Sequence, residues 1–452
     1  MSARLDWLDE RLRGWLCAPA GRGTRAALAL LTATAFFLLL MTRTLVQLTD
    51  APLLLRAAGV AVLTLPLAVM LLFGMGIARE RAESAAGVLL TCALCALAML
   101  ARLSFVERSS GDYDIYLAAW LEKLAEGSFV DGMKADIGEY NVLYQYILFL
   151  ITRLPVPPLY AVKAVSFIGD AALAGAVAAL AARDGRPGMA AFGAMLLLPT
   201  AVLNGGMFAQ CDSLYAACAL WGLALALRGR PVPSAVCFAL SLAFKLQAVF
   251  LLPIVAVLWA DRRLRVADAG VFLLTLAAVM LPAVLGGKSP ARIIGIYMAQ
   301  TGLYTGLNYG AANLFGLMPT QGLDVYAYGG FAMALALGTC VLLVGAGMHR
   351  AGHMTGDDYV HLALLLVLLI VFLLPRMHER YFYLAGALSV ALACRLPRMI
   401  PAAALIELAS LSTYWALELP LAAASGMMLA AIVLVLASFA GWGRNLLSEG
   451  KA

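Results

Sequence analysis

Long runs of apolar residues, separated by short polar segments, extend along nearly the whole chain. A bilayer core needs about 20 helical residues, and several runs are shorter, so we expect some helices to be broken, tilted or shielded by neighbours. The pattern predicts an all-α polytopic membrane protein with about 14 transmembrane helices. The predicted spans are 26–46, 57–77, 85–105, 158–182, 188–207, 214–228, 231–245, 246–260, 267–285, 330–348, 360–376, 381–394, 398–412 and 420–441.

Two longer segments, about 106–157 and 286–329, interrupt this pattern. The first contains DIYLAAWLEKLAEG, in which Ile115, Leu117, Leu121 and Leu124 lie near one helical face and Gly127 is a stop signal. The following NVLYQYILFLITRLP is too short for an ordinary span. We therefore expect amphipathic helices along the membrane surface in this segment.

Composition excludes a soluble globular protein: 63% of the residues are hydrophobic, 13% are charged and the mean hydropathy is +0.90. Cys92 and Cys95 form a C-x-x-C spacing, but they lie inside an apolar run without histidines or a second pair nearby, so we interpret them as small apolar residues.

The distribution of basic residues predicts the orientation. With a cytoplasmic N-terminus, the short inside loops hold 19 of the 32 Lys and Arg residues, and an even number of spans returns the C-terminus to the cytoplasm. The positive-inside rule also explains most of the net charge of +6. Both long segments then lie outside the cytoplasm.

Polar residues of four distant segments collect at the extracytoplasmic helix ends in this topology. Ionisable groups at membrane depth cost a few kcal/mol each, so this clustering favours a functional site. The four segments are SGDYDIY with Asp112 and Asp114, FAQCDSLY with Gln210 and Asp212, FKLQAVF with Lys245 and Gln247, and PRMHERYF with Arg376, His378, Glu379 and Arg380.

Each segment also has a structural interpretation. Asp112 is as well explained by a helix N-cap as by catalysis, and one of Gln210 and Asp212 is better explained by capping of the next helix. Lys245 lies between two short apolar segments. Its ammonium can reach the outer membrane surface by snorkelling only if a helix ends at this position. Tyr113, Tyr116 and Trp120 suit an interfacial aromatic belt and could equally stack on sugars, and we favour the belt for at least two of them.

The motifs GDYDIYLAAW, FAQCDSLY, FKLQAVFLLP, NYGAANLFG and MHERYFYLA occur in this order. Together they resemble the GT-C superfamily of membrane glycosyltransferases, and the most similar branch is that of the dolichyl-phosphoglucose-dependent glucosyltransferases and their bacterial relatives. The resemblance covers roughly residues 85–395. We expect residues 1–84 to add a cytoplasmic segment and two helices, 85–395 to form the catalytic core, and 396–452 to form C-terminal helices and a cytoplasmic tail.

The resemblance implies that Asp112, the Asp of GDY, is the general base. It accepts the proton of an acceptor hydroxyl while a polyprenyl-phosphate-linked sugar donor loses its lipid phosphate. A phosphate leaving group needs positive charge rather than an acid, so one base and a cationic clamp imply a single inverting displacement. The residues expected to bind substrate are Asp114, Tyr140, Gln210, Asp212, Lys245, Gln247, Asn313, His378, Glu379 and Arg380.

The expected partners are the sugar donor, a glycan, lipid or protein acceptor, and the bilayer of the plasma membrane. We expect no nucleic acid and no cofactor. We also expect no metal, because the sequence has no D-x-D motif paired with a diphosphate, apart from DYD itself. The alternatives are a transporter or flippase of lipid-linked glycans, and a polysaccharide polymerase or ligase that uses lipid-diphosphate donors. A transporter would place ionisable groups near the bilayer midplane, often within an internal repeat.

Overall fold

The computed structural model describes residues 2–46, 52–135, 137–138, 140–302, 305–414 and 417–449, and 76% of the structure is helical. The first third contains α1 (Ser2–Cys17), α2 (Arg22–Val46), α3 (Leu53–Glu80), α4 (Ala85–Leu103), the π-helix η1 (Tyr113–Leu117), α5 (Ala118–Ala125), α6 (Phe129–Lys134) and α7 (Val142–Ile151). The middle contains α8 (Pro158–Leu180), α9 (Met189–Leu196), α10 (Pro199–Gly206), α11 (Asp212–Leu227), α12 (Pro231–Phe244), the 3-10 helix η2 (Leu246–Phe250), α13 (Ile254–Ala260), α14 (Val266–Leu285) and α15 (Pro290–Gly302). The last third contains β1 (Asn308–Tyr309), the 3-10 helix η3 (Leu314–Gly316), α16 (Val325–His349), α17 (Gly356–Leu373), β2 (Met377–His378), α18 (Tyr383–Arg395), the 3-10 helix η4 (Pro397–Met399), α19 (Ile400–Thr413) and α20 (Leu421–Glu449).

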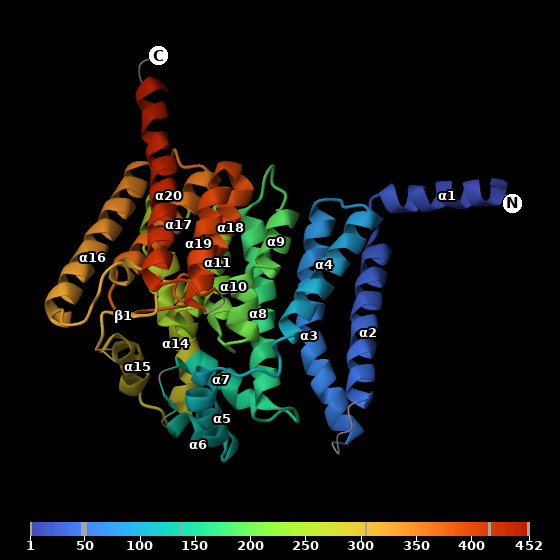
Figure 1. Ribbon diagram of the computed structural model, residues 1–452, viewed down its shortest axis with the longest axis horizontal. Coiled ribbons are helices and arrows are strands. Elements are labelled where there is room, and N and C mark those ends of the chain that lie inside the picture. Colours follow the sequence, from blue (N-terminus) through green and yellow to red (C-terminus); the bar gives the residue numbers. More distant parts are fainter. Residues whose placement is uncertain are drawn as a thin grey trace.

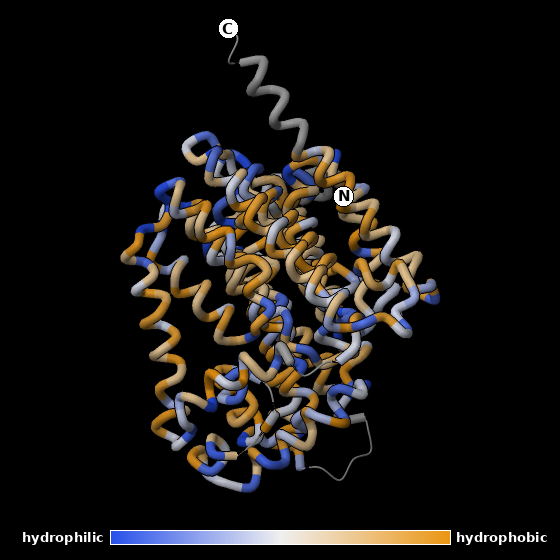
Figure 2. The backbone as a smooth tube through the Cα atoms, turned by 90° about the vertical axis from the view of Figure 1, so that its left-hand side faces the viewer, coloured by the Kyte–Doolittle hydropathy of each residue, from blue (hydrophilic) through white to orange (hydrophobic). Residues whose placement is uncertain are grey.

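The prediction of an all-α polytopic membrane protein is confirmed. Among the described residues, eight helices are long and apolar enough to cross a bilayer, namely α2, α3, α4, α8, α14, α16, α17 and α20. Each predicted apolar run contains a helix, but the other six are shorter or broken. The run 188–207, for example, is the pair α9 and α10, bent by 47°. The long helical stretches are mostly hydrophobic, as Figure 2 shows.

The two ends of the helix bundle differ. The segments α5, α6, α7 and α15 lie together at one end, which we call the loop end, whereas α1 and the end of α20 lie at the other, the terminal end (Figure 1). The helices α5, α6 and α7 of the first long segment and α15 of the second therefore lie at the same end of the bundle. The helices α2 and α3 stand at one edge beside α4 (Figure 1). The predicted division into an N-terminal unit, a core and a C-terminal unit stays a prediction.

The first long segment folds largely as its pattern predicts. Leu117, Leu121 and Leu124 are buried, and α5 ends at Ala125, two residues before the predicted stop. The prediction was wrong for Ile115, whose side chain is 66% exposed. Residues two apart point to nearly opposite sides of a helix, so Ile115 cannot share the face of Leu117.

Charged side chains hold the break between α9 and α10. Leu198 is extended because Pro199 follows it, which interrupts the helix. The guanidinium of Arg102 donates to the carbonyl of Leu196 at 2.7 Å, and the carboxyl of Glu407 accepts from the amide of Thr200 at 2.8 Å. One backbone group at each of the two helix ends is thus satisfied by a side chain inside the protein, as broken helices at membrane depth require. The break orients α10, which leads directly into the segment of Gln210.

A buried ion pair anchors the same region. Arg102 Nε lies 2.8 Å from Asp170 Oδ2, and the two side chains are 0% and 2% exposed. The hydroxyl of Tyr383 donates to the other carboxylate oxygen of Asp170 at 3.0 Å. This network joins α4, α8 and α18. The Cys92 and Cys95 thiols are free and buried in the apolar core beside it.

Candidate active site

A cavity of about 830 Å³ lies where several short helices end. Its walls come from η1 and α5, from the turn after α10, from the break between α12 and η2, and from the loop between α17 and α18. The structure therefore brings together the four polar segments that the sequence singled out. The predicted site residues that line this cavity are Asp112, Tyr140, Gln210, Lys245, Gln247, His378 and Arg380.

The carboxylate of Asp112 faces the cavity and is not a helix cap. Its side chain is 47% exposed, its Oδ2 accepts from Gln210 Nε2 at 3.0 Å, and Arg380 Nη1 lies 3.3 Å away. The capping role belongs to Ser110, whose hydroxyl accepts from the amide of Tyr113 at 3.3 Å. Asp112 makes no side-chain capping bond. The N-cap alternative for Asp112 is therefore wrong.

Lys245 stands at the predicted helix break. α12 ends at Phe244 and η2 begins at Leu246, while Lys245 itself adopts an extended backbone. Its ammonium lies 2.5 Å from Asp212 Oδ1, and the two side chains are 8% and 2% exposed. Asp212 is the first residue of α11, and its second oxygen accepts from Asn204 at 2.9 Å. The buried carboxylate thus holds the lysine at the cavity wall.

The loop between α17 and α18 supplies the other positive groups. Arg380 Nη1 lies 2.6 Å from Glu379 Oε1, its Nε lies 3.9 Å from Asp212 Oδ2, and His378 Nδ1 lies 3.7 Å from Glu379 Oε2. Burial by itself would raise the pKa of Glu379, but the neighbouring His378 and the positive charge of Arg380 outweigh it and lower the pKa to about 2. Glu379 is therefore a carboxylate at neutral pH and fixes the orientation of Arg380.

A short parallel pairing of β1 with β2 positions this loop. It aligns Asn308 with Met377 and Tyr309 with His378, and the rings of Tyr309 and His378 stack 5.3 Å apart. Asn313 is fully buried and donates to the carbonyl of Leu374 at 3.0 Å. Asn313 therefore holds the loop and does not line the cavity.

Three further predicted substrate-binding residues also lie outside the cavity wall. Asp114 is exposed and accepts from Ser109 at 2.9 Å. Asp212 and Glu379 lie behind Lys245 and Arg380 and contact them as described above. The predicted set therefore divides into residues that face the cavity and residues that hold them.

Aromatic side chains form the wall around Asp112. Tyr113, Tyr116, Trp120 and Tyr140 line the cavity, and the rings of Trp120 and Tyr140 meet edge to face at 5.4 Å. These residues do not form an outward-facing interfacial belt alone, because their rings border the same space as the charged groups. Flat aromatic faces of this kind can stack on sugar rings.

The backbone at the cavity is irregular. Ala209 and Arg376, both in the wall, have φ values of 52° and 64°, in the left-handed region that favours glycine. The motif after Asp112 is a π-helix, a form that frequently occurs at functional sites. Such conformations cost about 1–3 kcal/mol each and persist only where the surroundings enforce them.

Sequence reasoning missed several residues of the site. Gln300 of α15 and Met333 of α16 line the cavity, although no motif contains them. Asn204 donates both to Asp212 and to the hydroxyl of Tyr414, each at 2.9 Å. Asn204 could have been predicted from the sequence, because a side-chain amide within an apolar helix needs a hydrogen-bond partner.

Residues 141–261, a little over a quarter of the chain, match the family model described as alpha-(1->6)-mannopyranosyltransferase, N-terminal domain. This is a family of polytopic membrane glycosyltransferases of the GT-C type, so the predicted resemblance to GT-C enzymes is confirmed. The match names a mannosyltransferase rather than a glucosyltransferase. It includes Gln210, Asp212 and Lys245 but neither Asp112 nor Arg380. No curated protein matches the chain.

The match supports the coarser part of the predicted function. The chain is a multi-pass membrane protein whose similarity is to glycosyltransferases, which implies a sugar donor, an acceptor and a lipid bilayer as partners. The roles of individual residues, the donor lipid and the membrane side stay predictions.

Proposed function

We propose that this protein transfers a sugar from a polyprenyl-phosphate donor to an acceptor hydroxyl on the extracytoplasmic face of the plasma membrane, by one inverting displacement. One observation carries the proposal: a carboxylate, Asp112, faces the same cavity as Lys245, His378 and Arg380, although the three segments concerned are far apart in the sequence. A general base and a phosphate clamp are the two functions that this reaction requires.

Asp112 is the base. In the reaction, the acceptor oxygen bonds to the anomeric carbon while the bond from that carbon to the phosphate oxygen breaks, and the acceptor proton passes to Asp112. A base needs to lie about 2.6–3.2 Å from the hydroxyl oxygen. The 47% exposure of Asp112 leaves room for this approach. Gln210 holds Asp112 Oδ2 by a hydrogen bond, which leaves Oδ1 for the acceptor.

The contact between Asp112 and Arg380 has to open during the proposed reaction. At 3.3 Å, the carboxylate and the guanidinium are too close for a sugar to lie between them. An in-line displacement places the acceptor and the leaving phosphate on opposite faces of the anomeric carbon. The acceptor oxygen then lies about 3–3.5 Å from that carbon. The donor phosphate therefore has to take over Arg380 and separate it from Asp112.

Lys245 and Arg380 stabilise the departing phosphate. Each is held by a carboxylate behind the wall, Asp212 and Glu379 respectively. Such partners keep the cations in place and leave their remaining N–H groups for the phosphate. Arg380 Nε is buried and has no hydrogen-bond acceptor among the described residues. His378 borders the same space.

Mannose is the donor sugar to test first, because the matching family is named for alpha-(1->6)-mannopyranosyl transfer. Inversion converts a β-linked sugar phosphate into an α-glycoside. The proposal therefore requires a β-linked donor if an α-mannosyl product forms.

The membrane side can be tested separately. The Lys and Arg distribution favours a loop end outside the cytoplasm. A reporter active only outside the cytoplasm should function when fused near Ser128 or Asn308 and should fail near Asp184. The reverse pattern would contradict the proposed side without affecting the chemistry.

The decisive experiment uses the purified full-length chain in nanodiscs with radiolabelled β-mannosyl phosphopolyprenol and an α-mannoside acceptor. We expect transfer to the acceptor, with an α-linked product. The same sugar on a lipid diphosphate should not be used. Turnover of the diphosphate donor alone would favour a polymerase or ligase. Movement of an intact lipid-linked sugar across a vesicle membrane, without transfer, would favour a flippase.

A further inference from the structure

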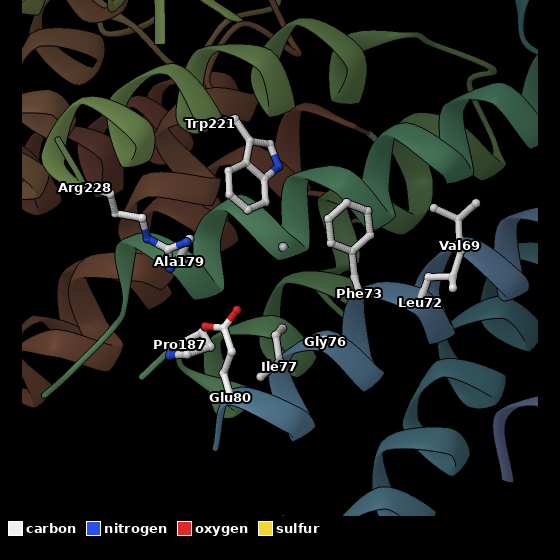
Figure 3. A pocket seen from close by; sticks show the side chains of 11 residues that line it. Val69, Leu72, Phe73, Gly76, Ile77, Glu80, Ala179, Pro187, Trp221 and Arg228 are labelled. Atoms are coloured by element: carbon white, nitrogen blue, oxygen red, sulfur yellow. The ribbon is translucent and has the colours of Figure 1, made fainter. Parts of the chain in front are cut away.

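A second cavity, of about 350 Å³, lies between α3, α8 and α11 and shares no lining residue with the active cavity (Figure 3). Its walls are almost entirely apolar. They include Leu72 and Phe73 of α3, Ala179 of α8 and Trp221 of α11. Leu72 is 73% exposed, so the cavity opens on the outer surface of the bundle, where lipid surrounds the protein.

The length of this groove matches one leaflet of a bilayer. Along α3 it extends from Val69 to Glu80. At 1.5 Å per helical residue that distance is about 16 Å. The hydrocarbon core is about 30 Å thick, so the groove reaches from one membrane surface to about the midplane. Glu80 is the last residue of α3, which places this groove in the leaflet of the terminal end.

A glycine keeps the groove open. A Cβ atom built on Gly76 meets no heavy atom within 4 Å. By contrast, the neighbouring Gly175 of α8 is covered, since a Cβ there would lie 2.6 Å from the ring of Phe73. Gly76 therefore borders space that a larger side chain could occupy without displacing the helices.

Two opposite charges stand at the surface end of the groove. Glu80 ends α3, and Arg228 follows the last residue of α11. Figure 3 shows both side chains extending toward the groove from different helices. Both are exposed, and within the part of the chain that the structure describes neither forms an ion pair or a side-chain hydrogen bond. A single headgroup with one anionic and one cationic part complements this arrangement.

We propose that this groove binds one phospholipid with a zwitterionic, primary-amine headgroup of the phosphatidylethanolamine type. One acyl chain lies along Leu72, Phe73 and Trp221. Arg228 binds the phosphate, and Glu80 accepts hydrogen bonds from the ammonium. A quaternary headgroup cannot donate such bonds, and an anionic headgroup would be repelled by Glu80. The bound chain fills the space between α3 and α8 and joins the N-terminal helices to the rest of the bundle. This inference does not depend on the proposed enzymatic function.

The test is native mass spectrometry of the delipidated full-length protein, titrated with dioleoyl lipids that carry ethanolamine, choline or glycerol headgroups. We expect the wild type to retain one ethanolamine lipid per chain in preference to the other two. Glu80→Gln should reduce the affinity for the ethanolamine lipid about tenfold or more and abolish its preference over the choline lipid. Arg228→Gln should weaken both of these lipids.

Gly76→Leu tests the groove itself. We expect this variant to remain folded, with an unchanged circular dichroism spectrum, and to lose the retained lipid. Arg230→Gln is the matched control, because Arg230 is exposed two residues beyond Arg228 and does not line the groove. Retention of the lipid by folded Gly76→Leu, or equal retention of all three headgroups by the wild type, would overturn the proposal.

Discussion

Two pairs of arginine and aspartate, one in the helix bundle and one in the active cavity, combine the same groups in opposite ways. Arg102 and Asp170 are 0% and 2% exposed and 2.8 Å apart, and Tyr383 and the carbonyl of Leu196 add further hydrogen bonds, although Arg102 Nη2 has no partner among the described residues. Arg380 and Asp112 are 15% and 47% exposed and 3.3 Å apart. The first pair is fully enclosed, whereas the second is open on the side of Asp112 and is shared with other partners.

This difference separates structure from function. A buried ion pair needs nearly all its hydrogen bonds, because leaving either charge alone in a medium of low dielectric is very unfavourable. The pair in the cavity is partly open, since Asp112 is 47% exposed, so a substrate can replace one partner more easily than in the enclosed pair. The pair in the cavity is therefore suited to exchange its contacts during a reaction, and the pair in the bundle is suited to hold α4, α8 and α18 together.

The largest effect is expected for Asp112→Asn. The amide keeps the shape and can still contact Gln210, but it cannot accept a proton at neutral pH. Transfer should fall by about 10²–10⁴-fold while donor binding and thermal stability stay near those of the wild type. Turnover and melting temperature in nanodiscs measure the two properties. Wild-type turnover in this variant would exclude Asp112 as the base.

Asp170→Asn should mainly reduce stability, whereas Asp112→Asn should mainly reduce turnover. Asp170→Asn leaves the Arg102 guanidinium without its carboxylate in a fully buried place, which should reduce stability by about 3–5 kcal/mol. The loss should appear as lower expression and a lower melting temperature in detergent. The double variant Arg102→Met with Asp170→Asn removes both charges and should recover part of the loss. If Asp170→Asn remains as stable as the wild type, the contrast between the two pairs fails.

Lys245→Met should combine both effects, with a loss of turnover and some loss of stability. Removing a positive group from the leaving phosphate should reduce donor turnover by about 10²-fold. It also leaves Asp212 with Asn204 and the more distant Arg380 as partners, so some stability should be lost. Lys245→Met combined with Asp212→Asn should restore the stability but not the turnover. If the double variant turns over donor normally, Lys245 is only a structural partner of Asp212.

The smallest effect is expected for Asp114→Asn. Asp114 is exposed, contacts Ser109 and does not line the cavity, in contrast to Asp112 two residues earlier. Transfer should change by less than about threefold, consistent with a surface substitution. Initial rates at saturating and limiting acceptor concentration measure this. A loss as large as that of Asp112→Asn would move the base by two residues.

Much of the fold could be predicted from the sequence because lipid exposure imposes simple rules. A lipid-facing helix must be apolar over its length, and its backbone must satisfy itself, so hydropathy alone located a helix in all 14 predicted runs. The same rules made the charged segments conspicuous, which is why Asp112, Gln210, Lys245 and Arg380 were identified before their geometry was known. The prediction for Ile115 failed because its position in the helical repeat was misjudged, and not because its hydropathy was misleading.

Only the tertiary structure decided which polar residues face the cavity and which support them. Asp112 and Asp114 are two residues apart and chemically identical, yet only the first contacts Gln210 and Arg380, because residues two apart on a helix point to nearly opposite sides. The pairing of Lys245 with Asp212, and of Arg102 with Asp170, joins segments 33 and 68 residues apart. Sequence determines where a charge needs a partner, because burial without one is too costly. Which partner it finds depends on how helices distant in the sequence pack together in space.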